Sequence, residues 1–143
     1  MPEKKTIRRA RKDARQGKAA STQAGEFVHE EMDHIRQGKH GARSTKQAIA
    51  IGLSKARRAG VKLAPPKKGS AATKRKAQQD LKRAKSHKPA SAKRSAARSK
   101  ALKREPRSAA SHRALSRQAK KAARTRRSSG SSTSRRRTSR SRK

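Results

Sequence analysis

The chain has 143 residues, with 45 Lys and Arg against 8 Asp and Glu, so its formal net charge at pH 7 is +37. Only 28% of the residues are apolar and none is Cys, which excludes a disulfide framework, a thiolate metal site and a core that orders the whole length. No apolar run matches a membrane span or a signal-peptide core, so we expect a cytoplasmic protein without a membrane span.

Residues 1–24 form a basic N-terminal arm in which no apolar periodicity is visible. A solvated, frayed segment and a DNA-contacting segment fit this composition equally well, because both need only Lys and Arg in water. The cations on which both interpretations depend are Arg8, Arg9, Arg11, Lys12, Arg15 and Lys18.

Residues 25–64 contain nine of the thirteen larger apolar residues found beyond Met1, and only this part has the pattern of a fold. A first helix is predicted over about 25–37, ended by Gly38 and Gly41. Its apolar stripe consists of side chains at intervals of four and three, namely Val28, Met32 and Ile35.

A second helix is predicted over about 45–59. Ser44 and Gln47 fit a capping box, in which the Ser hydroxyl accepts from a free amide and the Gln side chain reaches back. After the helix, Gly60 supplies a left-handed residue and Val61 can fold back onto the last turn. One face of this helix carries Ile49, Leu53 and Ala56.

Two helices joined by a short Gly-containing loop predict a helical hairpin. Half of the acids lie on the first helix, whereas the second carries several cations and no acid, so the two attract. Exposed pairs of this kind contribute only about 0–1 kcal/mol each. Because the apolar content is small, we expect the hairpin to need a homodimer partner, the basic arm or DNA to stay folded.

The segment 46–60, Lys-Gln-Ala-Ile-Ala-Ile-Gly-Leu-Ser-Lys-Ala-Arg-Arg-Ala-Gly, follows a Gly-Lys-His-Gly turn at 38–41 and an earlier Glu26-Phe27 pair. Together these residues resemble a family of small basic bacterial proteins with a domain of unknown function, sometimes labelled DNA-binding. The resemblance covers about 40 residues. It implies a bacterial source and supplies neither a mechanism nor catalytic residues.

Residues 65–127 are rich in Lys, Ala, Arg and Ser, and residues 128–143 form a Ser/Arg run. Ala, Lys and Arg are good helix formers, but the cations repel one another. We therefore expect residues 65–127 to be a disordered tail that forms helices on DNA, in the manner of the linker-histone tails that it resembles. Residues 128–143 are expected to be disordered in any state.

These features predict a mostly α-helical, extensively disordered protein that binds duplex DNA through its phosphates, without sequence preference, and compacts it as a histone-like, nucleoid-associated protein. The candidate nucleic-acid-binding residues are cations of the second helix and the tail: Lys46, Lys55, Arg57, Arg58, Lys74, Arg75, Lys76, Lys82, Arg83, Lys93, Arg94, Arg98, Lys120, Lys121, Arg124, Arg126, Arg127, Arg135, Arg136 and Arg137.

Proteins that bind single strands stack the bases on aromatic rings, and this chain has a single aromatic residue, Phe27, which the helix pattern assigns to the core. Duplex DNA is therefore favoured over single strands. An RNA- or ribosome-associated basic protein is the first alternative, since RNA phosphates attract the same cations. A general binder of polyanions or anionic membrane surfaces is the second.

Neither a metal site nor an active site is predicted. His29 and His34 lie five positions apart, whereas a zincin helix needs His side chains four apart to share a face. No nucleophile lies near a base and an orienting acid, and no Gly-rich phosphate loop follows a strand. We therefore expect no metal, no cofactor, no small-molecule substrate and no enzymatic activity.

Overall fold

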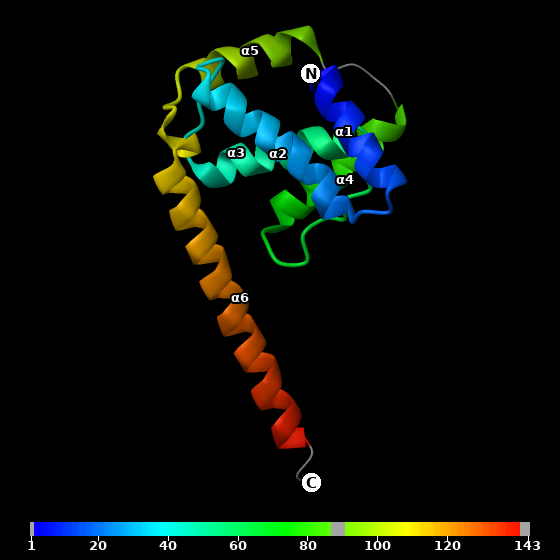
Figure 1. The fold of residues 1–143 in the computed structure, drawn as a ribbon, viewed down its shortest axis with the longest axis vertical. Coiled ribbons are helices and arrows are strands. Elements are labelled where there is room, and N and C mark those ends of the chain that lie inside the picture. The colour runs from blue at the N-terminus through cyan, green and yellow to red at the C-terminus, as the bar shows by residue number, and fades with distance from the viewer. Residues whose placement is uncertain (1, 87–90, 141–143) are drawn as a thin grey trace.

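The computed structural model describes residues 2–86 and 91–140, and side chains as far as residue 128. Within these ranges every regular element is a helix (Figure 1). In chain order the elements are α1 (Lys4–Arg15), α2 (Ala20–Arg36), α3 (Thr45–Arg58), α4 (Ala71–Ser86), α5 (Ala92–Lys103), the short 3₁₀ turn η1 (Ser108–Ala110) and α6 (His112–Arg140).

The predicted hairpin is observed as α2 and α3, which pack directly against each other. Gly38 has a φ of +75° just beyond the end of α2, and Gly60 has a φ of +99° just beyond α3. At the start of α3 the Ser44 hydroxyl accepts from the amide of Gln47 at 3.2 Å. The Gln47 side chain in turn accepts from the amide of Arg43, one residue before the position that a strict capping box uses.

The hairpin does not complete its own core. One buried cluster joins Met32 and Ile35 of α2 and Ala48 of α3 to Ala109 and Ala110 of η1. The hydroxyl of Thr45 donates to the carbonyl of Ala109 at 2.7 Å, and Arg36 Nε donates to that of Ala110 at 3.0 Å. Residues more than sixty positions further along the chain therefore close this side of the hairpin.

The second buried cluster involves the N-terminal arm, which forms the helix α1 rather than an irregular segment. Ala10 of α1 packs with Ala24 and Phe27 of α2 and with Ala56 of α3. The buried face of α1 consists of small or polar residues, Thr6, Ala10 and Asp13. The one larger apolar side chain that α1 adds is Ile7, which is partly buried against this cluster. A single apolar residue makes no periodic pattern, so the apolar pattern gave no sign of the helix. The arm thus provides within one chain the support that a homodimer partner was also expected to give.

Residues 71–86, expected to be disordered in the absence of DNA, form α4 and pack on α3. Ala77 and Asp80 are buried there. α5 has no buried residue, and α6 extends away from the other helices (Figure 1). The expected disorder of the cationic tail is not confirmed for the described part of residues 65–140, and residues 87–90 and 141–143 lie outside it.

α2 and α3 approach closely at Gly52. A Cβ atom added there would lie 2.7 Å from the Cα of Val28 in α2, closer than real Cβ contacts allow. Gly25, inside α2, is the opposite case, because an added Cβ would meet nothing within 4 Å. The sequence motif around Gly52 therefore contains a residue required by helix packing.

We predict that Gly52→Ala lowers the free energy of unfolding by about 1–3 kcal/mol, because the helices must separate to admit the methyl group. Gly25→Ala, the matched control in an open helical position, should raise it by about 0.5–1 kcal/mol through helix propensity. Urea unfolding followed by circular dichroism measures both. Equal effects of the two substitutions would contradict the close approach at Gly52.

Candidate nucleic-acid interface

Half of the acidic side chains lie inside the fold. Asp13, Glu30, Glu31 and Asp80 are buried, although a carboxylate is among the side chains least often found in a protein interior. Each of them contacts at least one cationic or His side chain of the chain itself. The carboxylates are therefore used as internal counterions and contribute little negative charge to the exterior.

Glu31 joins α2 to α3. Its side chain has 0% exposure, and its Oε2 accepts from Lys55 Nζ at 2.6 Å. Breaking a buried pair by removal of one partner leaves an uncompensated charge and destabilises a protein by roughly 3–5 kcal/mol. The attraction predicted between the acidic and basic helices is thus present as one buried ion pair.

Asp80 joins α4 to α3 in the same way. Its carboxylate has 1% exposure, accepts from the Ser54 hydroxyl at 2.6 Å and from Lys76 Nζ at 3.2 Å, and lies 3.8 Å from Arg58 Nε. Without this carboxylate, Lys76 of α4 and Arg58 of α3 would face each other with no negative charge between them. The docking of α4 therefore depends on one acid in a segment that is otherwise strongly basic.

The cations show the reverse distribution. Of the Lys and Arg residues whose side chains the structure describes, all are exposed except Lys55 and Arg57. Arg57 Nε donates to the carbonyl of Leu63 at 3.1 Å, and a terminal nitrogen donates to that of Ala64 at 3.3 Å. Burial lowers the pKa of the Arg57 guanidinium from its ordinary value, while the charge of Asp80 raises it. Arg57 thus holds the segment after α3 in place.

The candidate residues consequently divide into two groups. Lys55 and Arg57 are engaged in the fold, and Arg58 and Lys76 contact Asp80 while their side chains remain partly exposed. Exposed side chains are found at Lys46 on α3, at Lys74, Arg75, Lys82 and Arg83 on α4, at Lys93, Arg94 and Arg98 on α5, and at Lys120, Lys121, Arg124, Arg126 and Arg127 on α6. The side chains of Arg135, Arg136 and Arg137 lie outside the described ones.

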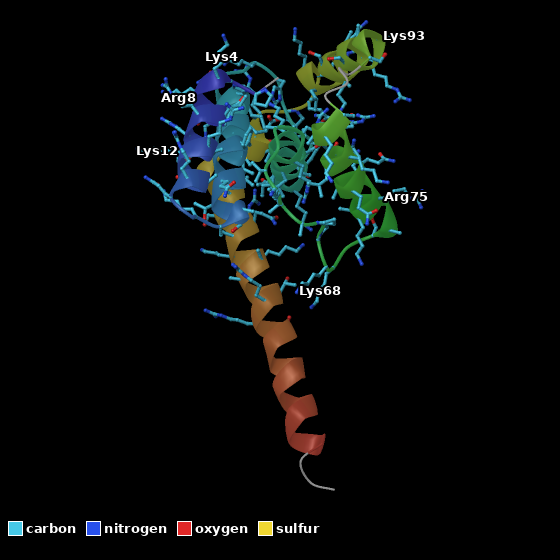
Figure 2. All side chains as sticks on the ribbon, turned by 90° about the vertical axis from the view of Figure 1, so that its right-hand side faces the viewer. Lys4, Arg8, Lys12, Lys68, Arg75 and Lys93 are labelled. Atoms are coloured by element: carbon cyan, nitrogen blue, oxygen red, sulfur yellow. The ribbon has the colours of Figure 1, made fainter. Side chains whose placement is uncertain are left out.

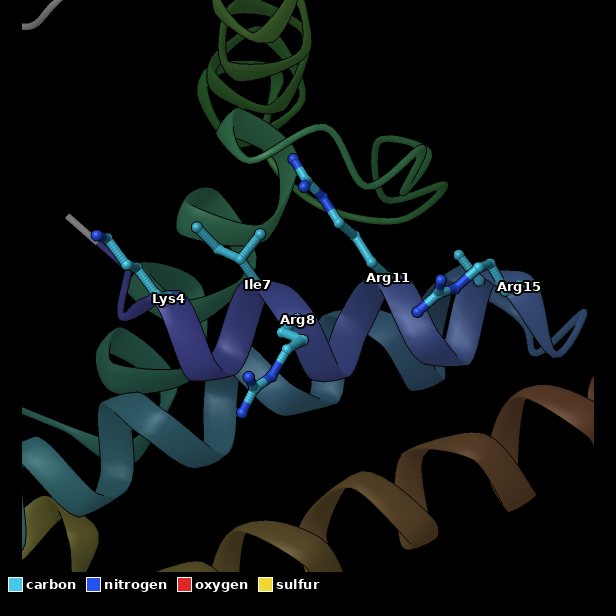
Figure 3. Close-up of a pocket in the computed structure, with 6 residues that line it drawn as sticks. Lys4, Ile7, Arg8, Arg11 and Arg15 are labelled. Atoms are coloured by element: carbon cyan, nitrogen blue, oxygen red, sulfur yellow. The ribbon is translucent and has the colours of Figure 1, made fainter.

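The helix α1 adds cations that the candidate set did not contain. Lys4, Arg8, Arg11 and Arg15 recur at intervals of four, three and four, which is the spacing of one helix face. With Ile7 and Ala14 they line an open hollow along α1, and Figure 3 shows the labelled side chains projecting from that helix. The helical spacing of the cations themselves was the signal available in the sequence.

The exposed cations surround the helical body instead of gathering on one face. Figure 2 shows Lys4, Arg8 and Lys12 on one side of the molecule and Arg75 on the opposite side. α1 contacts α2, and α4 contacts α3, so the hairpin separates these two cationic helices. This arrangement offers phosphate contacts in more than one direction.

The described helices include none long and apolar enough to span a lipid bilayer. Residues 15–68, which include all of α2 and α3, match the model of a family of unknown function, DUF6496. This match agrees with the resemblance of the hairpin to a domain of unknown function. No curated protein and no solved structure gives a significant match.

We predict that Asp80→Ala detaches α4 from α3, because Arg58 and Lys76 then repel each other and the Ser54 hydroxyl loses its acceptor. Trypsin should cleave within residues 71–86 faster than in the unchanged protein, as mass spectrometry of the fragments will show. The free energy of unfolding should fall by about 1–3 kcal/mol.

Asp33→Ala is the matched control for Asp80→Ala. It also removes one negative charge, but Asp33 has 39% side-chain exposure in its contacts with His29 and Arg36. An effect below about 1 kcal/mol is expected for such an exposed pair. Identical cleavage patterns in the two variants would refute a specific role of Asp80 in holding α4.

Proposed function

We propose that this protein is a histone-like, nucleoid-associated DNA-binding protein that contacts phosphates without reading the base sequence and compacts the duplex. Its role is binding, without catalysis. One observation carries the proposal: buried carboxylates act as internal counterions, while all described Lys and Arg side chains except Lys55 and Arg57 face solvent. A phosphate backbone approaching from solvent therefore meets a surface of almost one sign.

Release of condensed counterions gives such a surface its affinity. Each phosphate that a Lys or Arg neutralises contributes about −0.9 to the slope of log affinity against log salt on duplex DNA. The stripe of Lys4, Arg8, Arg11 and Arg15 extends over the twelve residues of α1, a rise of about 16 Å, and one strand of a duplex has a phosphate every ~3.4 Å of axis. Several phosphates of one strand are thus within the length of α1.

The position of the hairpin cations favours backbone contacts over base readout. On α3, Lys55 and Arg57 are engaged by Glu31 and by backbone carbonyls. Base readout needs side chains free to reach donors and acceptors in a groove. Phosphate contacts need only exposed cations, which α1, α4, α5 and α6 supply.

Two further observations support a duplex as target and compaction as outcome. Phe27, the single aromatic residue, is 1% exposed in the core, so no ring is available for the base stacking by which single strands are bound. Cations on opposite sides of the hairpin allow one molecule to contact two duplex segments at once (Figure 2).

We predict that affinity for unrelated duplexes is equal within a few-fold at each salt concentration and that it falls steeply with salt. Engagement of ten cations would give a log–log slope near −9. Fluorescence anisotropy over a salt series measures it. A marked preference for one duplex, or a slope shallower than about −3, would refute the proposal, and tighter binding of structured RNA than of DNA would favour an RNA-associated role.

We also predict that the contacts are spread over the molecule. Changing Lys4, Arg8, Arg11 and Arg15 to Gln should make the salt slope less negative by about 3 to 4, because four contacts are lost at about 0.9 each. The same change at Lys93, Arg94, Arg98 and Lys100 of α5 should have a similar effect. A loss confined to one set would indicate a single binding groove instead.

The buried Arg57 provides the control for these two variants. Arg57→Gln removes a positive charge that faces the carbonyls of Leu63 and Ala64 rather than solvent. It should lower the thermal midpoint of unfolding and leave the salt slope unchanged at temperatures where the variant is folded. A changed slope would mean that the exposed cations are not the phosphate-binding groups.

A further inference from the structure

A cluster of potential metal ligands lies beside the turn between α2 and α3. Glu31, His34 and His40 each offer one ligand atom, and these atoms all lie within 4.8 Å of one another. Glu31 and His34 are three residues apart on α2, a spacing by which helices of metal-binding bundles present a carboxylate and an imidazole to one ion. The left-handed turn at Gly38 brings His40 back toward them.

The carboxylate of Glu31 has one oxygen without a hydrogen-bond partner. Lys55 donates to Oε2, whereas Oε1 finds no donor among the described residues, although the side chain is fully buried. An unsatisfied buried acceptor of this kind typically costs about 1–3 kcal/mol, and more when it is charged. The free oxygen points to a missing positive partner at this position.

His40 presents a second acceptor, its Nε2 atom, to the same place. Its Nδ1 lies 3.1 Å from the carbonyl oxygen of Gly41, which can only accept, so Nδ1 carries the proton. In the neutral ring Nε2 is then an acceptor, and it faces the free Oε1 of Glu31 at 3.4 Å. Two acceptors facing each other are both satisfied by a cation bound between them. A backbone carbonyl on the second ring nitrogen is the usual outer partner of a metal-bound His.

The third ligand, His34, is shielded, with a side-chain exposure of 12%. Its Nε2 lies 2.9 Å from Glu3 Oε1 and 3.8 Å from Glu30 Oε1. The hydrogen bond with His34 makes the largest contribution to lowering the pKa of the Glu3 carboxyl, and the hydrogen bond with Lys39 makes the next largest. Glu30 Oε2 is a second buried oxygen that finds no hydrogen-bond partner in the described part of the chain, so a further carboxylate lies next to the trio.

We propose that Glu31, His34 and His40 bind one divalent transition-metal ion of the Zn²⁺ class, which fastens the loop before α3 to α2. Two imidazoles and a carboxylate are ligands that suit Zn²⁺, whereas Mg²⁺ and Ca²⁺ prefer oxygen alone. Lys55 continues to donate to Oε2 of Glu31 and so orients the carboxylate. The site is structural, and it does not depend on the DNA-binding proposal.

The experiment uses the full chain after treatment with a chelator, in the absence of nucleic acid. Zn²⁺ is titrated by calorimetry, and thermal unfolding is recorded with and without the ion. We expect one Zn²⁺ per chain and a higher unfolding midpoint with Zn²⁺, because a ligand that binds only the folded state stabilises it. His40→Gln should weaken binding by at least about 10-fold, which is the lower range for loss of an outer partner alone.

His29→Gln is the matched control, because His29 lies on the same helix, is 68% exposed and contacts Asp33 instead of the trio. Its Zn²⁺ affinity should equal that of the unchanged protein. Absence of binding up to about 1 mM Zn²⁺, unchanged affinity in His40→Gln, or an equal loss in His29→Gln would each overturn the proposal, whose alternative is a protonated His40 paired with Glu31.

A measurement on the unchanged protein keeps the test valid if His40→Gln does not fold. In ¹H–¹⁵N spectra of the imidazole groups, Zn²⁺ should shift the resonances of His34 and His40 and leave those of His29 and His112 in place. Shifts confined to His29 and His112 would show adventitious surface binding and would overturn the assignment.

Discussion

The ammonium of Lys55 lies 2.6 Å from a carboxylate oxygen of Glu31 in the contact between α2 and α3, where the Glu31 side chain has no exposed surface. A chain with 45 cations and 8 acids can fold only where repulsion is offset, and Glu31 is placed where two helices meet. Asp80 performs the same task between α3 and α4. Because these carboxylates pair with cations inside the fold, the charge on the exterior is mostly positive. The pairing that permits folding therefore also gives the protein its cationic surface.

The hairpin could be predicted because its signals are local. Gly38 and Gly60 act through their left-handed backbone and Ser44 through its capping hydroxyl. α3 matches its expected range within one residue, whereas α2 begins five residues before its expected start, in residues assigned to the basic arm. α1 and α4 could not be predicted from apolar pattern, since their buried residues are Ala, Thr and Asp, and Ile7 is the one larger apolar side chain that α1 packs against the core. An Ala that closes a contact and an Ala that faces solvent look alike in a sequence.

The candidate site was predictable in composition but not in detail. Exposure of most cations follows from the cost of burying a charge. Lys55 and Arg57 are exceptions because they bond to Glu31 and to the carbonyls of Leu63 and Ala64. Only the fold determines that these groups lie close together. The approach of His40 to Glu31 and His34 could not be predicted from helical spacing, because a turn carries His40 back to the helix.

The contact between the α2–α3 turn and η1 has a consequence for the order of folding. Gly41 donates to the carbonyl of Leu102 in the last turn of α5, and Thr45 to that of Ala109 in η1, so this side of the core closes a loop that contains α3, α4 and α5. Closing a loop of that length is entropically unfavourable and slow, and here the loop also repels itself. Under the proposed function, a polyanion that neutralises the loop would remove this second barrier. The speed with which the protein acquires its final shape would then depend on the polyanions present while it folds.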